Sequence, residues 1–366
     1  LRKDSRSCGG IVPSHVEDPS SSARLSPFEP GPDGAQLFTA QGIQRAWVFS
    51  VPMRVKFRNI TVREGLILQG RAGLAEAAPF DNYPPQVAAT WFSGAFAVAA
   101  QGLPAPPSPV PLNVTVPVVA PDTAARLVRE SGCGTAKVKV ADPRSDLEDD
   151  IARIRAVRSA LGTAGQIRVD ANAAWSLAEA KTALPRLSEA AGPAGLQYAE
   201  QPCQTLDELV ELQRETGIPV AADETIRLGG QLTEVIASGL AAAVIKAMPL
   251  GGPTRAAALV ADGLREVAPG GTSAPLLVVS SALDTGVGLS AGLALAAQLQ
   301  TTAACGLGTL RLFTDSILTA DPHLENGCLY PAKTLELKGN LAPVNPAVSK
   351  RWRERVEQVA AVFARL

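Results

Sequence analysis

Three acidic side chains end apolar stretches in the middle of the chain. Asp170 closes the stretch 167–170, Glu200 closes 196–200, and Asp223 follows 219–222. Carboxylates that lack cysteine or histidine partners suit Mg²⁺ or Mn²⁺ rather than zinc. Three such anions at one place repel one another, and a bound divalent cation would remove that repulsion. The sequence therefore predicts a Mg²⁺ site, with Mn²⁺ as the other candidate ion. The alternative is that each acid pairs with a buried lysine.

Lysines occupy matching positions on other stretches. Lys137 and Lys139 lie near the end of 135–140, and Lys246 follows 243–245. Because side chains alternate along a strand, Lys137 and Lys139 are expected to share the inward face. A suitably placed lysine can take a proton from carbon, and a second lysine can act as another base or stabilise developing negative charge. Removal of a proton α to a carboxylate gives an enediolate, which a divalent cation and a lysine would stabilise.

The same alternation assigns the neighbours of these residues. Arg168 and Asn172 lie two positions before and after Asp170, so all three are expected to face inward. Glu224 directly follows Asp223 and is therefore expected to point outward to the helices, in a structural role.

The spacing of these residues is that of a βαβ repeat. Successive charged ends are separated by one strand, one helix and their loops. In a (β/α)₈ barrel the strand ends meet on one face, where catalytic groups sit. Eight strands are expected at 112–119, 135–140, 166–172, 196–202, 219–224, 242–249, 275–281 and 303–307. Capping-box patterns mark three helix starts between them: Ser145 with Glu148, Ser176 with Glu179, and Thr205 with Glu208.

The expected fold class is therefore α/β, a (β/α)₈ TIM-type barrel with an α+β capping domain. The barrel is expected to span 112–329, and the cap 42–111, completed by the C-terminal segment from about 330 to 366. Residues 1–41 are rich in Ser, Pro, Gly and Asp without a sustained period. This composition is typical of a disordered tail.

Bulk properties exclude several classes of function. The chain has 366 residues, 46% of them hydrophobic, and a formal net charge of −1. This balance gives no electrostatic reason to bind nucleic acid or an anionic membrane, and no apolar run reaches the length of a membrane span. Five widely spaced cysteines and the lack of a signal-peptide core predict reduced thiols in a cytoplasmic protein. The expected partner is a small-molecule carboxylate, and nothing indicates the oligomeric state.

The pattern of strand ends resembles that of the enolase superfamily, and of its muconate-lactonising subgroup in particular. The shared features are Lys-x-Lys on the second strand, Asp-x-Asn on the third, Glu on the fourth, Asp-Glu on the fifth and Lys on the sixth. The resemblance covers about residues 44–366. It implies that Lys139 is the acid/base and Lys246 the opposing lysine, with Lys137 and Asn172 in support. It also implies that Asp170, Glu200 and Asp223 bind Mg²⁺.

Four further segments, 52–54, 57–65, 280–285 and 304–309, narrow the resemblance. They are similar to those of actinobacterial enzymes that dehydrate a cyclohexadiene carboxylate bearing a succinyl group, a step of menaquinone biosynthesis. The implied reaction is that of a lyase, a syn elimination of water. The contacts expected from this reading are Arg54, Arg58 and Arg63 with the succinyl carboxylate, and Ser280 and Ser281 as lining of the pocket.

Three other functions use similar residues. Racemisation of N-acylated (N-succinyl) amino acids needs the same metal with Lys246 as a true second base. A muconate-type cycloisomerase shares the fold, which alone does not decide the function. The non-enzymatic alternative is a lapsed barrel kept as a binding protein. The two histidines, His15 and His323, lie on no expected barrel strand, which argues against the subgroup that uses a histidine base.

Overall fold

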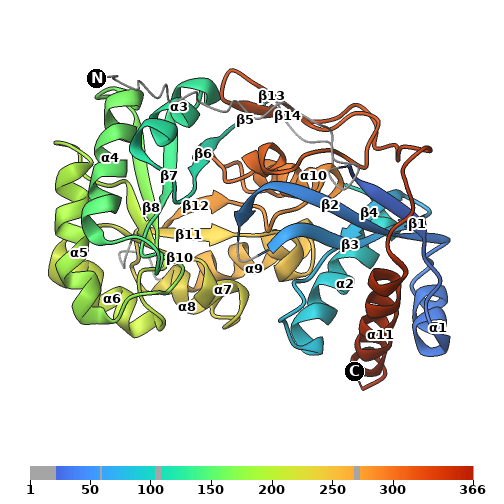
Figure 1. Ribbon diagram of the computed structural model, residues 1–366. Coiled ribbons are helices and arrows are strands. Elements are labelled where there is room, and N and C mark those ends of the chain that lie inside the picture. The colour runs from blue at the N-terminus through green and yellow to red at the C-terminus, as the bar shows by residue number, and fades with distance from the viewer. Residues whose placement is uncertain (1–21, 58–59, 104–108, 268–272, 366) are drawn as a thin grey trace, which may run out of the picture.

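The computed structural model describes residues 22–57, 60–103, 109–267 and 273–365, which form a barrel and a cap (Figure 1). Seven parallel strands make the curved barrel sheet, and their order across the sheet is their order in the chain. The eighth expected stretch closes the ring through single bridges, Leu112 to Cys305 and Ser280 to Gly306. The predicted (β/α)₈ class is confirmed. The strands are β6 (Asn113–Val116), β7 (Thr135–Lys139), β8 (Gln166–Asp170), β9 (Tyr198–Glu200), β10 (Val220–Ala222), β11 (Ala242–Ile245) and β12 (Leu276–Val279).

Helices cover the outside of the ring, as Figure 1 shows for α4, α5 and α6. Each follows its strand, so the strand ends share one face of the barrel. The barrel helices are α3 (Pro121–Ser131), α4 (Leu147–Leu161), α5 (Leu177–Ala190), α6 (Leu206–Thr216), α7 (Glu224–Arg227), α8 (Leu232–Ala237), α9 (Pro253–Glu266) and α10 (Gly286–Gln298). Two 3₁₀ turns, η2 (Met248–Leu250) and η3 (Gly308–Leu312), follow β11 and the eighth stretch.

Two of the three predicted capping boxes are present. Ser176 pairs with Glu179 at the start of α5, and Thr205 pairs with Glu208 at the start of α6. The first prediction is one residue out of register, because Asp146 and Asp149 form the box of α4. The hydroxyl of Ser145 donates instead to the buried Asp150 at 3.1 Å.

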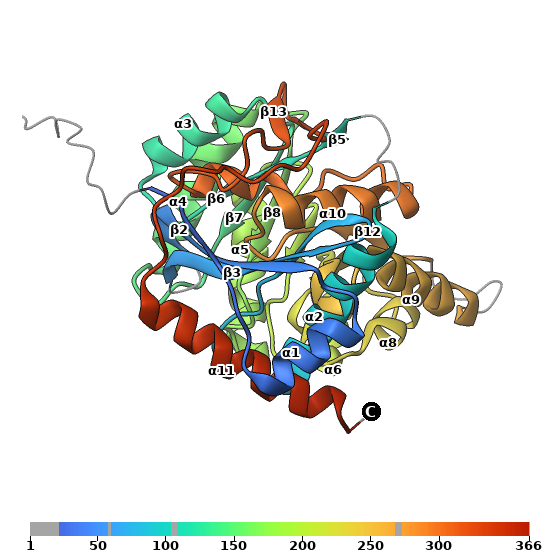
Figure 2. The same cartoon turned by 90° about the vertical axis from the view of Figure 1, so that its right-hand side faces the viewer.

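The cap is a four-stranded antiparallel sheet covered by three helices. Its strands β1 (Arg24–Pro27), β2 (Arg45–Phe57), β3 (Ile60–Gly70) and β4 (Gly73–Ala77) pair in chain order. The helices α1 (Pro32–Ala40), α2 (Pro85–Gln101) and α11 (Pro346–Phe363) lie side by side on one face of this sheet (Figure 2). The C-terminal helix therefore packs onto the N-terminal part of the chain, and Trp352 and Val356 are buried there. A small sheet of β5 (Val110–Pro111), β13 (His323–Glu325) and β14 (Cys328–Tyr330) joins the two parts.

The prediction of a disordered tail is wrong for residues 22–41, whereas residues 1–21 lie outside the described part of the chain. The strand β1 pairs with β2, so that Leu25 stands opposite Phe49. In α1, Leu37 and Phe38 are buried, and the rings of Phe38 and Phe96 are 6.0 Å apart. The low apolar content of this stretch is sufficient because its few apolar side chains meet partners that the rest of the chain supplies.

Two further expectations can be compared with the described residues. Cys133, Cys203, Cys305 and Cys328 are free thiols, as predicted, and Cys8 lies outside the described part. No helix among the described residues has the length and apolar character needed to cross a membrane.

Candidate active site

The three predicted acids gather at neighbouring strand ends. Asp170 ends β8 in register with Glu200 at the end of β9, and Asp223 directly follows β10. All three are buried, with exposed fractions of 1%, 1% and 0%. Parallel pairing in register places successive carboxylates side by side on the inner face of the barrel.

Lysines stand among these acids. The Nζ atom of Lys137 lies 2.7 Å from Glu200 Oε1 and 3.0 Å from Asp170 Oδ2. The Nζ atom of Lys139 lies 2.5 Å from Asp170 Oδ2, and that of Lys246 lies 2.6 Å from Asp223 Oδ1. Each acid therefore contacts a lysine, which is the arrangement that the sequence offered as the alternative to a bound metal.

The charges of this cluster shift its acid–base equilibria. Burial raises the pKa of Asp170, but Lys137 and Lys139 outweigh it and hold that pKa well below its usual value. Burial, and next the charge of Asp170, raise the pKa of Glu200. Burial lowers the pKa of Lys137, but Asp170 and Glu200 outweigh it and raise that pKa above its usual value. The cluster thus keeps Asp170 ionised, whereas burial and the charge of Asp170 favour the neutral form of Glu200.

The donor chemistry of the site fits a hard divalent cation. No group of three or more His, Cys, Asp or Glu side chains in the described residues is arranged to hold a metal ion as it stands. The oxygens of Asp170, Glu200 and Asp223 are engaged instead by lysine ammonium groups. All three donors are nevertheless buried carboxylates on adjacent strands, and burial, followed by the charge of Asp170, raises the pKa of Glu200. A bound cation would favour the ionised form of all three.

A small cavity of about 30 Å³ is bordered by the three lysines and Asp170. It is lined by Thr115, Lys137, Lys139, Asp170, Lys246, Ser280, Ser281, Leu283, Gly306 and Thr309. The predicted pocket serines are thus among its lining. The Ser281 hydroxyl is hydrogen-bonded to that of Thr309 at 2.9 Å, and the Ser280 hydroxyl donates to Gly306 O at 3.4 Å. A wider cavity of about 570 Å³ adjoins it at Lys139 and is also lined by Asn172, Lys56 and Arg144.

Asn172 and Glu224 extend the network on the side of Lys139. Lys139 Nζ donates to Asn172 Oδ1 at 2.5 Å, and Asn172 Nδ2 donates to Glu224 Oε1 at 3.2 Å. The expectation that Glu224 points away from the site is wrong. Asp223 ends the regular strand alternation, because the chain turns directly into α7 and brings Glu224 back toward Asn172.

Arg168 is held inside the barrel by polar groups and by an aromatic ring. Its guanidinium donates to Asn113 Oδ1 at 3.0 Å and to Ala304 O at 2.8 Å, and it lies 4.8 Å above the ring of Tyr198. The residue pairs in register with Lys137, one layer of side chains deeper than Asp170. It therefore points inward as predicted, but it packs inside the barrel and does not line the cavity.

The cap arginines lie in different surroundings. Arg54 is exposed and lines a cavity of about 370 Å³ beside β6, α3 and η3, which shares the lining residue Thr115 with the central cavity. Arg63 is 2% exposed, and its guanidinium binds backbone carbonyl groups. Arg58 lies outside the described residues.

The sequence reading missed Leu283, Thr309 and Lys56 as lining residues. Leu283 and Thr309 fall within the segments 280–285 and 304–309 that carried the family resemblance, so that signal was present. Lys56 lies two positions after Arg54 on β2. The path of this strand over the barrel decides that Lys56, and not Arg54, lines the wider cavity.

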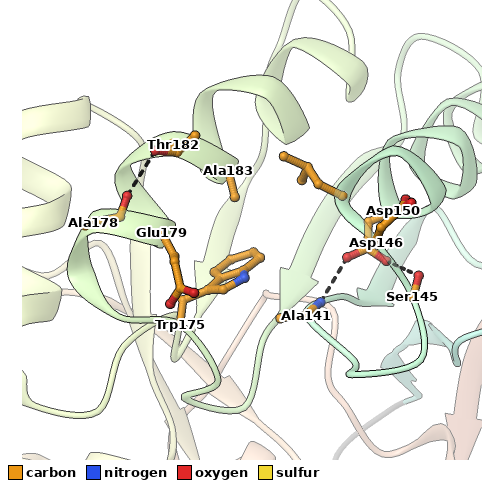
Figure 3. Close-up of a pocket in the computed structure, with 10 residues that line it drawn as sticks. Ala141, Ser145, Asp146, Asp150, Trp175, Ala178, Glu179, Thr182 and Ala183 are labelled. Carbon is orange, nitrogen blue, oxygen red and sulfur yellow. Dashed lines mark hydrogen bonds between the residues drawn. The ribbon is translucent and has the colours of Figure 1, made fainter.

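A fourth pocket, of about 450 Å³, lies outside the ring between the first turns of α4 and α5 (Figure 3). Its buried acid Asp150 accepts from Ala141 N at 2.9 Å and from the Ser145 hydroxyl, and forms an ion pair with Arg153 at 2.6 Å. These polar groups satisfy one another, and the pocket contains none of the lysines of the central cavity.

Comparison with known proteins agrees with this geometry. The family model described as "Enolase C-terminal domain-like" matches residues 120–334, and "Enolase N-terminal domain-like" matches residues 48–99. The o-succinylbenzoate synthase of Thermobifida fusca (strain YX) is 42% identical over 86% of this chain and 96% of its own length. That of Mycobacterium marinum is 40% identical over 86% of this chain and 93% of its own length.

This chain belongs to the o-succinylbenzoate synthase family of the enolase superfamily.

Solved structures show the same fold for more distant members. A dipeptide epimerase from Enterococcus faecalis V583, solved with Mg and the dipeptide L-Leu-L-Tyr, has a TM-score of 0.65 at 18% identity and covers 79% of this chain and 96% of its own. The muconate cycloisomerase from Pseudomonas fluorescens has a TM-score of 0.62 at 17% identity and covers 88% of this chain and 96% of its own. The o-succinylbenzoate synthase family thus shares its barrel and cap with an epimerase and a cycloisomerase.

Proposed function

We propose that this protein is an o-succinylbenzoate synthase, a lyase that removes water from a hydroxycyclohexadiene carboxylate bearing a succinyl group. The observation that carries the proposal is the ring of Lys137, Lys139, Asp170 and Lys246 around one cavity, in a chain 42% identical to a curated o-succinylbenzoate synthase. In this family the product is an aromatic acid of the menaquinone pathway.

Lys139 is the proposed acid/base. It lines both the small inner cavity and the wider cavity of about 570 Å³, so a substrate can reach its Nζ atom. Its amine takes the proton α to the ring carboxylate, the bond from ring carbon to hydroxyl breaks, and the Lys139 ammonium returns a proton to the departing hydroxide. Because one group on one face does both, the elimination is syn.

Three other groups support this step. Asn172 accepts from Lys139 Nζ at 2.5 Å and so orients the base. Lys246 directly follows β11, which is four strands from β7 in the sheet order, yet it lines the same cavity. It is suited to stabilise the negative charge that develops on the substrate as the proton leaves. Lys56 and Arg144 line the wider cavity and, together with the predicted Arg54, are suited to the succinyl carboxylate.

Asp170, Glu200 and Asp223 are the residues that would hold Mg²⁺, or Mn²⁺ in its place. When bound, the ion supplies electrostatic stabilisation of the carboxylate oxygens of the enediolate. Lys137, which contacts both Asp170 and Glu200, would then keep these two carboxylates aligned and partly neutralised.

The direct test is an assay with the succinylated cyclohexadiene substrate, followed by the absorbance of the aromatic product. We expect turnover that stops when divalent ions are chelated and returns when Mg²⁺ is added, with Mn²⁺ compared in parallel. Metal binding measured by calorimetry without turnover would instead favour a binding protein. Absence of turnover in metal-loaded protein would contradict the proposal.

Racemisation of N-succinyl amino acids is the second candidate, favoured by one observation. Lys139 and Lys246 reach a single cavity from non-adjacent strands, as two bases on opposite faces of a carbon would require. Deuterium exchange at the α-carbon of N-succinyl amino acids distinguishes the two activities. We expect the dehydration to be faster by far, and the reverse order would assign the protein to the racemases.

A further inference from the structure

Arg63 of the cap reaches the loop that follows β12 in the barrel. Its Nε atom donates to Leu283 O at 3.0 Å, and its Nη2 atom donates to Ala282 O at 3.3 Å and to Ala78 O of the cap. The guanidinium also lies 4.5 Å above the ring of Phe80. One buried cation thus holds backbone carbonyl groups from both parts of the molecule.

A guanidinium buried in this way is stable only while its donors have acceptors. Burial disfavours its charge and lowers the pKa of Arg63, whereas the charges of Glu76 and Asp284 act in the opposite direction. The rigid fork of arginine fixes the directions of its donors, so the carbonyls of the loop must come to set positions to satisfy it. The loop 282–283 is therefore placed by the cap.

The loop needs such support. Leu283 has a φ of 62°, a left-handed conformation that residues other than glycine rarely adopt and keep only where their surroundings hold them. Within the loop, Ala282 N donates to Asp284 Oδ2 at 3.0 Å. The carbonyl of Leu283 is held from the cap by Arg63. The strained residue is thus fixed from both sides.

Leu283 is one of the residues that line the active-site cavity. It lines the same cavity as Lys139 and Lys246, and it is the one large apolar side chain among the described residues that line it. The position of this side chain therefore decides how much apolar surface a bound ring can meet beside the lysines.

Glu76 of β4 is a second cap residue that binds the loop, at its other end. Its carboxylate accepts from Thr285 N at 3.1 Å, from the Thr285 hydroxyl at 2.6 Å and from Gly288 N at 3.0 Å, which is the N-terminus of α10. Glycine at 288 suits this close approach, because a Cβ atom there would lie 2.7 Å from Asp284 Cβ and 2.9 Å from Glu76 Oε2. Arg63 and Glu76 thus hold the loop at both ends.

We propose that Arg63 is a positioning residue of the active site, which sets Leu283 from the cap as the apolar wall of the substrate pocket. That the occupant is a cyclohexadiene ring rests on the function proposed above. The effect of Arg63 on the substrate then passes through Leu283 and not through its charge.

A double-mutant cycle tests this proposal. The variants are Arg63→Met, Leu283→Ala and the double variant. Arg63→Met keeps the bulk of the side chain and removes the N–H groups that donate to the carbonyls. Arg63→Met should raise KM roughly tenfold and change kcat by less than about threefold, and Leu283→Ala should do the same. In the Leu283→Ala protein, Arg63→Met should add less than about a twofold change. Arg45→Met, an exposed arginine of the same sheet, is the matched control and should leave KM unchanged.

Two results would overturn it: unchanged KM in a folded Arg63→Met protein, or effects of the two changes that multiply fully. If Arg63→Met does not fold, Arg63→Lys, which keeps the charge with fewer donors, takes its place in the cycle. Amide hydrogen exchange of residues 281–285 gives a readout that needs no substrate. Exchange should be faster in the Arg63 variant and unchanged in Arg45→Met. Lack of turnover in the wild-type protein would refute the proposed function alone, whereas equal exchange in the wild-type protein and the Arg63 variant would refute the role of Arg63.

Discussion

Lys137 and Lys139 lie two positions apart on one strand and have different partners. Lys137 is buried and contacts both Asp170 and Glu200. Lys139 is less buried and contacts Asp170 and Asn172. It lines the wider cavity as well as the inner cavity. At the residue scale, this difference assigns proton transfer to Lys139 and charge balance among the acids to Lys137.

The change Lys139→Ala should therefore lower kcat by at least about 10²-fold, since it removes the acid/base and leaves the other cavity residues in place. The far-UV circular dichroism spectrum should not change. Lys181→Ala is the matched control, because Lys181 forms ion pairs with Glu211 and Glu215 on the barrel surface. Activity of Lys139→Ala within about threefold of that control would exclude Lys139 as the base.

At the scale of elements, the cap helix α2 meets the barrel where two backbones come close. A Cβ atom at Gly94 would lie 2.5 Å from Gly252 N and 2.7 Å from Gly251 C, just before α9. Backbone atoms cannot move aside as a flexible side chain can. The packing of α2 on the barrel therefore depends on the missing side chain of Gly94.

The change Gly94→Ala is predicted to lower the free energy of unfolding by about 1–3 kcal/mol, because the added methyl group overfills this contact. Thermal denaturation would measure it. Gly134→Ala is the control, since a Cβ atom at Gly134 would meet no atom within 4 Å. Equal melting temperatures for the two variants would show that α2 can shift without cost.

At the scale of the whole molecule, cap and barrel are joined by buried polar contacts near two strand ends of the catalytic face. Arg63 and Glu76 hold the loop after β12. On another side of the ring, the Tyr83 hydroxyl accepts from Arg227, which also donates to Asp223 Oδ1 at 3.2 Å. Docking of the cap is therefore linked to groups that shape the site, so stability and activity are expected to change together when these contacts are broken.

The acid in this interface makes stability depend on pH. Burial, and next Asp284, raise the pKa of Glu76 from 4.5 to about 7. Between these values the folded protein binds more protons than the unfolded chain, so the free energy of unfolding should fall as pH rises through this window. Glu76→Gln removes the titration and should reduce that fall by about 1–3 kcal/mol.

Urea denaturation at several pH values would measure this dependence. Glu354→Gln, at an exposed position of α11, provides the comparison. If the free energy of unfolding changes with pH equally in Glu76→Gln, Glu354→Gln and the wild-type protein, the pH dependence arises elsewhere in the molecule.

The sequence by itself determined the barrel and the central residues of the site. Strand alternation and the βαβ spacing act locally, so they predicted that Lys137, Lys139 and Asp170 face one interior. The same local rule failed at Glu224, where the strand has ended and the helix α7 has begun.

Only the tertiary structure decided the rest. It ordered residues 22–41, because Leu37 and Phe38 find apolar partners far along the chain. It separated the cap arginines, since Arg54 and Arg63 have the same side chain but one lies on the surface and the other is buried against the carbonyls of Ala282 and Leu283. Such contacts join residues about two hundred positions apart. Local sequence periodicity cannot predict these contacts, because they depend on how the cap and the barrel pack together.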